Sequence, residues 1–167
     1  MPLTIRTQQP ADLATICAIN EAAFAEHGGT KAFDRFREER TDILSLVAVD
    51  EDELVGHVLF SPVSMATPTG PVMGMGLGQL AVTPARQNQG IGTLLGKAGI
   101  NELRKTDCAY IIVIGHAKYY PRFGFEIGST HGVKCQWEGI PDETFMVLFT
   151  DPARQTSLQG VASFEGM

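Results

Sequence analysis

The sequence is poor in the residues that several functional classes need. Its three cysteines, Cys17, Cys108 and Cys135, lie far apart, without a CxxC pair or a histidine spacing that would form a zinc site. Basic residues are also scarce: 13 Lys and Arg against 19 Asp and Glu give a net charge of −6, which argues against a nucleic-acid-binding surface. No apolar run approaches membrane-spanning length, and the chain does not start like a signal peptide. We therefore expect a cytoplasmic protein with no metal, nucleic-acid or membrane partner.

The length and composition are those of an ordinary globular protein. The chain has 167 residues, of which 44% are apolar and 19% are charged, so it can bury one sizeable core. We expect a single domain over residues 1–167. The sequence does not indicate whether this domain is a monomer or a homodimer.

The first third of the chain alternates strand and helix patterns. Leu3 and Ile5 begin a short strand, and an apolar face at helical spacing predicts a helix over residues 13–24. Residues 31–40 carry many charges and predict a second, mostly exposed helix. Apolar runs at 44–49 and 53–61 flank three consecutive acids and predict a hairpin with a tight reversal. Alternation in the second run makes His57 partly buried, which favours a hydrogen-bonded core residue over a catalyst.

The most informative stretch runs from Gln79 to Leu103. A short apolar strand ends at Pro84, because proline lacks an amide donor and disfavours helical geometry at the residue before it. A polar loop with Gly90 and Gly92 follows, and apolar residues at helical spacing then predict a helix from about Gly90. The first amides of a helix lack intrahelical acceptors and lie at the positive end of its dipole. This arrangement is typical of phosphate binding.

Two common phosphate-binding motifs do not fit the glycine spacing. A Walker A loop needs four residues between its glycines and then Gly-Lys, whereas Gly90 and Gly96 are separated by five and Gly92 and Gly96 by three. The dinucleotide motif GxGxxG would need a third glycine at position 95, where Leu95 stands. The loop therefore belongs to neither nucleotide-binding class.

The remaining elements complete a βαβ unit and a C-terminal group of strands. The Gly-, Pro- and Met-rich residues 62–78 precede a fourth strand that we expect to begin near Met75, and the continuous apolar run Tyr110–Ile114 predicts a strand buried on both faces. Strand, helix and strand in succession predict a parallel pair. Late strands are expected at 145–149 and, more weakly, at 160–164, while Trp137 either caps the core or lines a pocket.

Two segments resemble the GCN5-related N-acetyltransferases. Gln87–Gly92 (QNQGIG) matches the family loop Gln/Arg-x-x-Gly-x-Gly/Ala and follows Leu80–Val82 and Pro84 in the family order. Downstream, Tyr120–Phe125 (YPRFGF) looks like the family's Tyr-x-x-x-Gly-Phe segment. Together with the C-terminal sequence, these segments resemble the YhbS-like branch of predicted acetyltransferases.

This resemblance implies an α/β (α+β) fold and a cosubstrate. The family has a mixed central sheet, here of about six to seven strands, in which the fourth and fifth strands are parallel and splayed, with about four flanking helices. Pantetheine lies in the cleft between those two strands, strand amides bond it, and the loop amides hold the pyrophosphate of acetyl-CoA. The implied cofactor-binding residues are Leu80, Ala81, Val82, Gln87, Asn88, Gln89, Gly90, Ile91, Gly92, Thr93 and Tyr120.

The resemblance also suggests catalytic roles. Tyr120 stands four residues before Gly124, where the family commonly places the general acid that protonates the coenzyme A sulfur. The family often has a carboxylate base near position 79, but Gln79 cannot accept a proton at neutral pH. The base stays unassigned, with His57, His116, Glu26 and a water chain as candidates. Tentative acceptor contacts, between the first two helices, are Phe24, Glu26 and His27.

Two functional hypotheses follow. The first is an acetyl-CoA-dependent N-acetyltransferase that acetylates a primary amine of a small molecule, peptide or protein by direct attack in a ternary complex. No cysteine lies in a motif that would suggest an acetyl-enzyme intermediate. The alternative is a non-catalytic acyl-CoA-binding or regulatory module. Gln79 favours that alternative, and Tyr120 argues against it.

Overall fold

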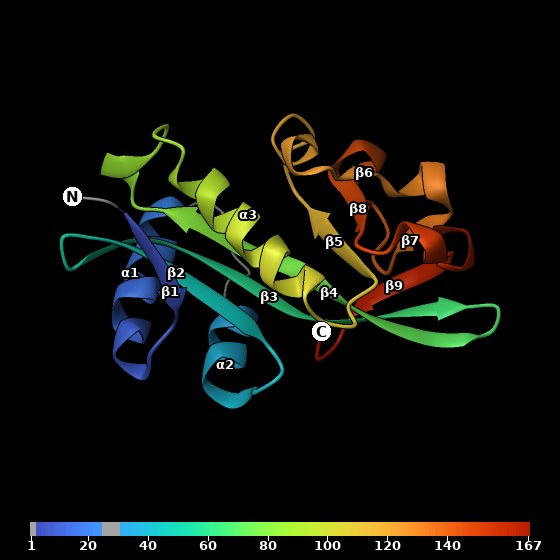
Figure 1. The fold of residues 1–167 in the computed structure, drawn as a ribbon, viewed down its shortest axis with the longest axis horizontal. Helices are drawn as coiled ribbons and strands as arrows, with labels where there is room; N and C mark the ends of the chain where they lie inside the picture. Colours follow the sequence, from blue (N-terminus) through green and yellow to red (C-terminus); the bar gives the residue numbers. More distant parts are fainter. Residues whose placement is uncertain (1–2, 25–30) are drawn as a thin grey trace. The chain divides into compact units, whose positions relative to one another are not determined.

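The protein folds around a mixed β-sheet flanked by helices (Figure 1). Its structure is a computed structural model that describes residues 3–24 and 31–167. The α-helices and strands are, in order, β1 (Thr4–Thr7), α1 (Leu13–Ala23), α2 (Lys31–Glu39), β2 (Leu44–Asp50), β3 (Glu53–Thr67), β4 (Gly70–Val82), α3 (Ile91–Arg104), β5 (Tyr110–Ile114), β6 (Glu126–Ile127), β7 (Val133–Cys135), β8 (Phe145–Phe149) and β9 (Gly160–Phe164).

Hydrogen bonding joins the strands in the order β1-β2-β3-β4-β5-β8-β6, and β9 pairs with β3 and with β7. The β4–β5 pair is parallel, as the βαβ pattern predicted, and extends only over Met75–Leu77 of β4. The fold class is confirmed. Among the described residues the sheet has nine strands, because the short β6 and β7 add to the six to seven expected.

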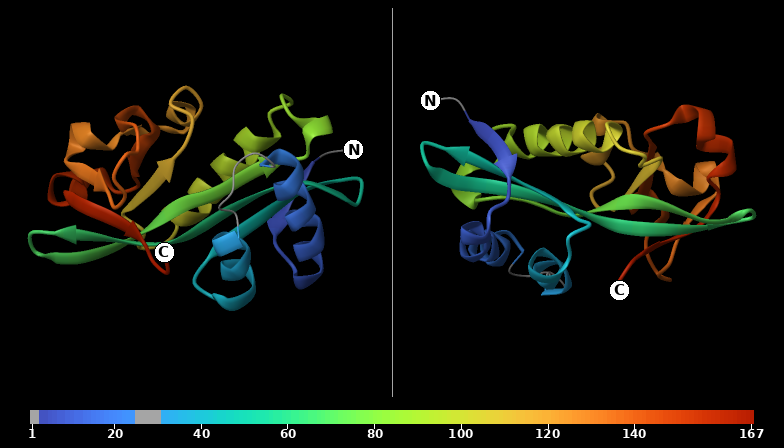
Figure 2. Two further views of the ribbon diagram at one scale, coloured as in Figure 1. Left: turned by 180° about the vertical axis from the view of Figure 1, so that it is seen from behind. Right: turned by 60° about the horizontal axis from the view of Figure 1, so that its bottom comes forward.

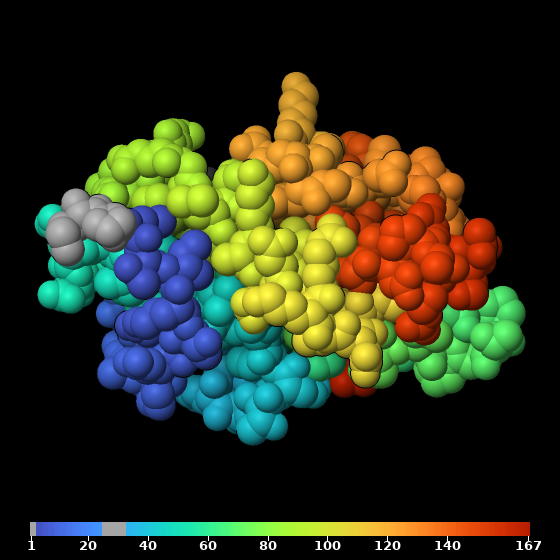
Figure 3. Space-filling view, viewed as in Figure 1, coloured from blue at the N-terminus to red at the C-terminus, as the bar shows by residue number. Residues whose placement is uncertain are grey.

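The chain divides into two compact units that share β3 and β4. Unit 1 comprises Met1–Phe60 with Gly78–Glu102, and unit 2 comprises Ser61–Leu77 with Leu103–Met167. In unit 1, α1 and α2 cover one face of the sheet and α3 covers the other (Figures 1 and 2). The outer side of α3 is open in the space-filling view, and Leu94 on this helix is 49% exposed (Figure 3). No described helix is both long and apolar enough to cross a membrane.

Close helix–sheet packing in unit 1 depends on small residues. A Cβ added to Gly56 on β3 would lie 3.1 Å from the Leu95 side chain on α3, and one added to Gly99 would collide with the Phe60 ring. On the other face, a Cβ on Gly78 would collide with Phe33 of α2. These glycines let both helix layers approach the strands closely.

The hairpin between β2 and β3 follows the sequence prediction. Glu51 and Asp52 have φ of 50° and 67°, the left-handed geometry of the turns that match strand twist. The α2 prediction needs correction, because the helix is not mostly exposed. Phe36 and Arg37 are 4% and 7% exposed, so one side of this charged helix is buried.

The stretch before Met75 also differs from the prediction. It forms the outer half of a long hairpin, with β3 continuing to Thr67 and β4 beginning at Gly70. Val63–Ala66 pair with β9, which lies almost 100 residues later in the sequence, so no local pattern could reveal the pairing. Pro62 lies between the part of β3 that pairs with β2 and the part that pairs with β9, and its carbonyl accepts a bond from the Glu165 amide.

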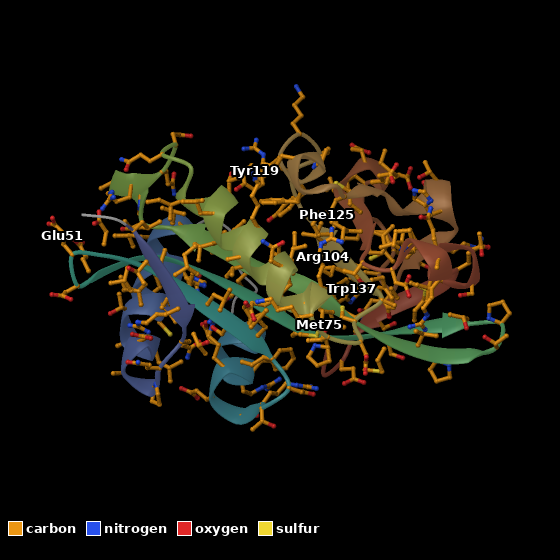
Figure 4. All side chains as sticks on the ribbon, in the orientation of Figure 1. Glu51, Met75, Arg104, Tyr119, Phe125 and Trp137 are labelled. Carbon is orange, nitrogen blue, oxygen red and sulfur yellow. The ribbon has the colours of Figure 1, made fainter. Side chains whose placement is uncertain are left out.

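Unit 2 has its own buried core on β5 and β8. Tyr110, Ile111 and Ile112 are at most 1% exposed and pair in antiparallel register with β8. Trp137, labelled in Figure 4, is 40% exposed and stacks on the buried Phe164 ring at 6.1 Å. Trp137 therefore caps the core of this unit, one of the two roles considered for it.

Candidate functional site

The connection from β4 to α3 is held by contacts at both ends. The Thr83 amide donates to the Val55 carbonyl at 2.8 Å, which fixes the end of β4, and Pro84–Arg86 then form a short 3-10 turn. The Gln87 side chain donates back to the Val82 carbonyl at 3.1 Å. The Arg86 guanidinium contacts Asp50 of β2 at 2.8 Å, so the loop is tied to the hairpin beside it.

The residues that follow present unpaired backbone donors. No described residue accepts a hydrogen bond from the amides of residues 88–92, and the first intrahelical bond of α3 is Leu94 N–H to the Gly90 carbonyl at 3.1 Å. Asn88 and Gly90 have φ of 63° and 83°, and a Cβ added to Gly90 would meet no atom within 4 Å. Residues 88–90 are exposed, and these five unpaired N–H groups at a helix N-terminus form an anion-binding surface.

In the described part of the chain, the last residues of β4 have no strand partner on the side of β5. The pairing of β4 with β5 ends at Leu77, so Leu80–Val82 lie beyond the paired segment. Ala81 is buried, whereas Leu80 and Val82 are partly exposed. An extended ligand can hydrogen-bond such an edge as a neighbouring strand would.

Tyr120 belongs to unit 2 and begins a 3-10 turn, Tyr120–Phe123. Its ring is 9% exposed and packs against Tyr119 and Phe125 at centroid distances of 5.2 and 6.0 Å. No described residue hydrogen-bonds its hydroxyl. Burial, with a smaller contribution from Tyr119, raises the pKa of Tyr120 above its ordinary value, so the phenol stays protonated at neutral pH.

Behind β4, unit 1 contains a closed ring of buried polar side chains. Arg37 of α2 lies 2.7 Å from His57 Nδ1 on β3, and His57 Nε2 lies 2.7 Å from Asn20 Oδ1 on α1. Asn20 Nδ2 donates to Gln79 Oε1 on β4 at 3.3 Å, and Arg37 donates to the same oxygen at 3.2 Å. We call Asn20, Arg37, His57 and Gln79 the buried ring.

The donors in this ring fix the protonation state of His57. A guanidinium can only donate, so Nδ1 of His57 accepts, and the proton on Nε2 is donated to Asn20. Burial, and secondarily the charge of Arg37, lowers the pKa of His57 well below its ordinary value. His57 is therefore neutral, and both of its nitrogens are engaged.

The structure describes only part of the predicted acceptor segment. Phe24 follows α1 and is partly buried, with its amide bonded to the Asn20 carbonyl at 2.8 Å. Glu26 and His27 lie outside the described residues. His116 is exposed in unit 2, where its carbonyl accepts from the Tyr119 amide at 3.0 Å.

A model of the acetyltransferase (GNAT) domain family matches residues 4–128. The chain belongs to the GNAT acetyltransferase family. The uncharacterized N-acetyltransferase YhbS of Escherichia coli K12 is 30% identical over 138 residues, which are 82% of this chain and 81% of YhbS. The predicted family, its YhbS-like branch and the enzyme class are confirmed.

Two solved GNAT structures resemble this chain closely. The Escherichia coli YhbS structure in complex with CoA has a TM-score of 0.88 at 27% identity and covers 98% of this chain and 89% of that one. A GNAT acetyltransferase from Brucella melitensis in complex with acetyl-CoA has a TM-score of 0.79 at 29% identity and covers 99% of this chain and 97% of that one.

Sequence reasoning missed most of the buried ring of this GNAT protein. It singled out His57 and Gln79. It assigned Asn20 to the first predicted helix without a role, and it placed Arg37 on a helix expected to be mostly exposed. The signal available was weak: Asn20 occurs at a position that continues the apolar face of α1, and Arg37 directly follows the apolar Phe36.

Proposed function

We propose that this GNAT protein transfers an acetyl group from acetyl-CoA to a primary amine by direct attack in a ternary complex. The observation that carries the proposal is the set of unpaired amides at residues 88–92, in the loop whose sequence matches the family motif. The two related proteins with solved structures bind CoA and acetyl-CoA. The amine acceptor follows from the family, and a small molecule, a peptide or a protein is consistent with it.

In this proposal the loop and β4 bind the cosubstrate. The pyrophosphate accepts from the unpaired backbone amides of residues 88–92. Several direct N–H bonds must carry this binding, because a helix dipole alone contributes only about 0.3–1 kcal/mol. Leu80–Val82 pair with the pantetheine amides along the unpaired edge of β4. An amide near Val82 then donates to the thioester oxygen as negative charge develops there, which lowers the barrier.

Tyr120 is the proposed general acid. The amine attacks the thioester carbon, the tetrahedral intermediate collapses with cleavage of the C–S bond, and the Tyr120 hydroxyl gives its proton to the departing thiolate. Two features support this role: Tyr120 occupies the tyrosine position of the family segment, and no described residue hydrogen-bonds its hydroxyl. The base stays unassigned: both nitrogens of His57 are engaged within the protein, which leaves His116, Glu26 and a water chain as candidates for the proton of the acceptor amine.

A non-catalytic acyl-CoA-binding module is the second candidate function. Gln79 favours it, because this residue replaces the carboxylate that the family often has there and its oxygen is already bonded to Asn20 and Arg37. A module of this kind would bind acetyl-CoA and release no CoA when amines are added.

The experiment that separates the two functions follows thiol release from acetyl-CoA. Amino acids, polyamines, aminoglycosides and short peptides serve as acceptors, and isothermal titration with CoA measures binding independently. Acceptor-dependent release with any amine supports the transferase. Tight CoA binding with no release across the panel would support the binding module, and a series of longer acyl-CoAs then tests the acyl chain length.

A further inference from the structure

The buried ring joins four separate elements of unit 1 through one set of hydrogen bonds. Asn20 comes from α1, Arg37 from α2, His57 from β3 and Gln79 from β4, and all four are at most 7% exposed. The directions of the bonds are mutually consistent, since Arg37 donates to His57 and Gln79, His57 donates to Asn20, and Asn20 donates to Gln79. The ring therefore locks both helices on this face to the two central strands.

Arg37 is the energetically expensive member of the ring. Its Nε has no hydrogen-bond partner among the described residues, and burial lowers the pKa of its guanidinium to about 10. Among the described residues no carboxylate hydrogen-bonds Arg37. Its other hydrogen-bond partners are the neutral Gln8, at 2.7 Å, and Ser45. The carboxylate that acts on it is that of Asp34, which accepts from Asn20 Nδ2 at 3.3 Å and stabilises the guanidinium only through space. A buried cation with no directly bonded carboxylate is poorly explained by stability, because well-packed apolar residues serve that purpose at least as well.

The position of Gln79 suggests what the cation does. Gln79 directly precedes Leu80–Val82, the segment proposed to hydrogen-bond the pantetheine and the thioester oxygen. The side-chain oxygen of Gln79 accepts two hydrogen bonds from the ring. We propose that Arg37 is a positioning residue for acetyl transfer. Through its bonds within the buried ring, Arg37 fixes β4, α1 and α2 in the geometry that presents the acceptor to the thioester. This inference rests on the proposed function.

The same geometry gives position 79 a role that needs no proton transfer. A carboxylate at this position would accept from Arg37 and Asn20 as the amide oxygen does, and the adjacent cation would hold its pKa low. A glutamate here would therefore be a permanently charged hydrogen-bond acceptor instead of a base. Position 79 is then a structural acceptor that either Gln or Glu can supply.

The first test replaces the ring arginine by lysine. Arg37→Lys keeps the charge but loses the planar fork that reaches His57 and Gln79 together, so we expect kcat/KM for the best amine of the panel to fall about 10- to 100-fold, as small misplacements of reacting groups do. The KM for acetyl-CoA should stay within about twofold of the wild-type value. Arg35→Lys is the matched control, because Arg35 is an exposed residue of the same helix.

Variants at position 79 test the ring without removing the buried charge. Gln79→Met deletes the acceptor and should lower kcat/KM for the amine in the same way as Arg37→Lys. Gln79→Glu keeps an acceptor oxygen, so its kcat/KM for the amine should stay near the wild-type value. Its pH profile of kcat/KM should show no new ionisation between pH 5 and 9. These two variants keep the inference testable if Arg37→Lys does not fold.

His57 provides a readout that is independent of turnover. In ring-intact protein, ¹⁵N NMR should show His57 with a bare Nδ1, a protonated Nε2 and no titration down to pH 5. In Arg37→Lys the His57 pKa should rise, because a donor and a neighbouring buried charge have moved.

The outcomes are distinct. If the wild type is active and Arg37→Lys behaves like Arg35→Lys, the inference is wrong while the proposed function stands. A new ionisation in Gln79→Glu with increased kcat would likewise overturn it, because position 79 would then hold a base. Absence of acceptor-dependent release by the wild type would overturn the proposed function, and the catalytic role of Arg37 with it.

Discussion

Unit 1 contains two polar regions that differ in whether their hydrogen-bonding groups are paired within the protein. Five backbone N–H groups in residues 88–92 have no partner among the described residues, whereas the buried ring pairs the side-chain atoms that link its four members inside the protein. The loop comes from one short stretch of chain. The ring draws residues from positions 20 to 79, on four elements.

The loop is arranged to bind an anion, whereas the buried ring is arranged to hold its helices and strands in position. Donors at a helix N-terminus that have no protein partner can exchange water for an anion without breaking a bond inside the protein. Paired donors in a buried ring would lose bonds if a ligand displaced them, which costs about 1–3 kcal/mol for each group left unsatisfied. We therefore expect changes in the loop to affect cosubstrate binding and changes in the ring to affect geometry and stability.

The largest effect is expected from a change outside both regions. Tyr120→Phe removes the proposed acid without altering the loop or the ring, so kcat should fall by roughly 10² to 10⁴ while acetyl-CoA affinity stays nearly unchanged. Steady-state kinetics and calorimetry measure the two quantities. Tyr119→Phe, which deletes the neighbouring hydroxyl, is the control, and full activity of Tyr120→Phe would end the assignment.

The next effect tests the loop directly. An aspartate at position 90 tolerates the positive φ, and its carboxylate would cap the first amides of α3 and repel a pyrophosphate. Gly90→Asp should therefore fold normally and bind CoA about 100-fold more weakly, equivalent to about 2.7 kcal/mol.

A second glycine provides the control for Gly90→Asp. Gly139 has a φ of 81°, close to that of Gly90, and an added Cβ there would also meet no atom within 4 Å. Gly139→Asp should leave CoA binding unchanged in the same calorimetric titration. Equal losses in both variants would show that added charge, instead of the loop amides, determines the effect.

The ring should make stability depend on pH. The pKa of His57 is lowered in the folded protein, so below about pH 6.5 the unfolded chain takes up a proton that the folded chain excludes, and stability falls as the pH falls. Between pH 7.5 and 5.5 this site should cost about 1.4 kcal/mol, measured by urea unfolding. His57→Gln, which can still accept from Arg37 and donate to Asn20, should remove that part of the pH dependence.

An exposed histidine gives the matched comparison for this pH effect. His116→Gln removes a histidine that lies outside the ring and should leave the loss of stability at low pH unchanged. An unchanged pH dependence in His57→Gln would instead show that the ring does not exclude the proton.

The smallest effect concerns the tie between the loop and the hairpin. Arg86 and Asp50 are partly exposed, and pairs of this kind contribute about 0.2–1 kcal/mol to stability. Arg86→Gln should lower the free energy of unfolding by no more than that amount, and added salt should diminish the difference from the wild type. A loss well above this range in urea unfolding would show that the loop depends on Arg86 for its fold.

The two regions also differ in how well the sequence predicts them. The strand, proline, loop and helix around Gly90 are consecutive, so their spacing was enough to predict the binding surface and to exclude two other phosphate loops. Strands with continuous apolar runs, such as β5 and β8, were predicted for the same local reason.

The ring could not be predicted because nothing local marks it. His57 and Gln79 were noticed for their chemistry, yet their partners Asn20 and Arg37 lie on two helices far away in the sequence, and no spacing links them to the strands. Arg37 was placed on an exposed helix because charged residues are usually solvated. The extension of β3 past Pro62 was missed because its partner β9 lies far along the chain.

An NMR titration with CoA tests the contrast between the two regions most directly. On addition of CoA, the backbone amide resonances of residues 88–92 should shift and become protected from solvent exchange, while the His57 ring nitrogens and the Asn20 side-chain amide keep their positions. Unchanged amides at 88–92 in the presence of bound CoA, or large shifts confined to the buried ring, would contradict the account.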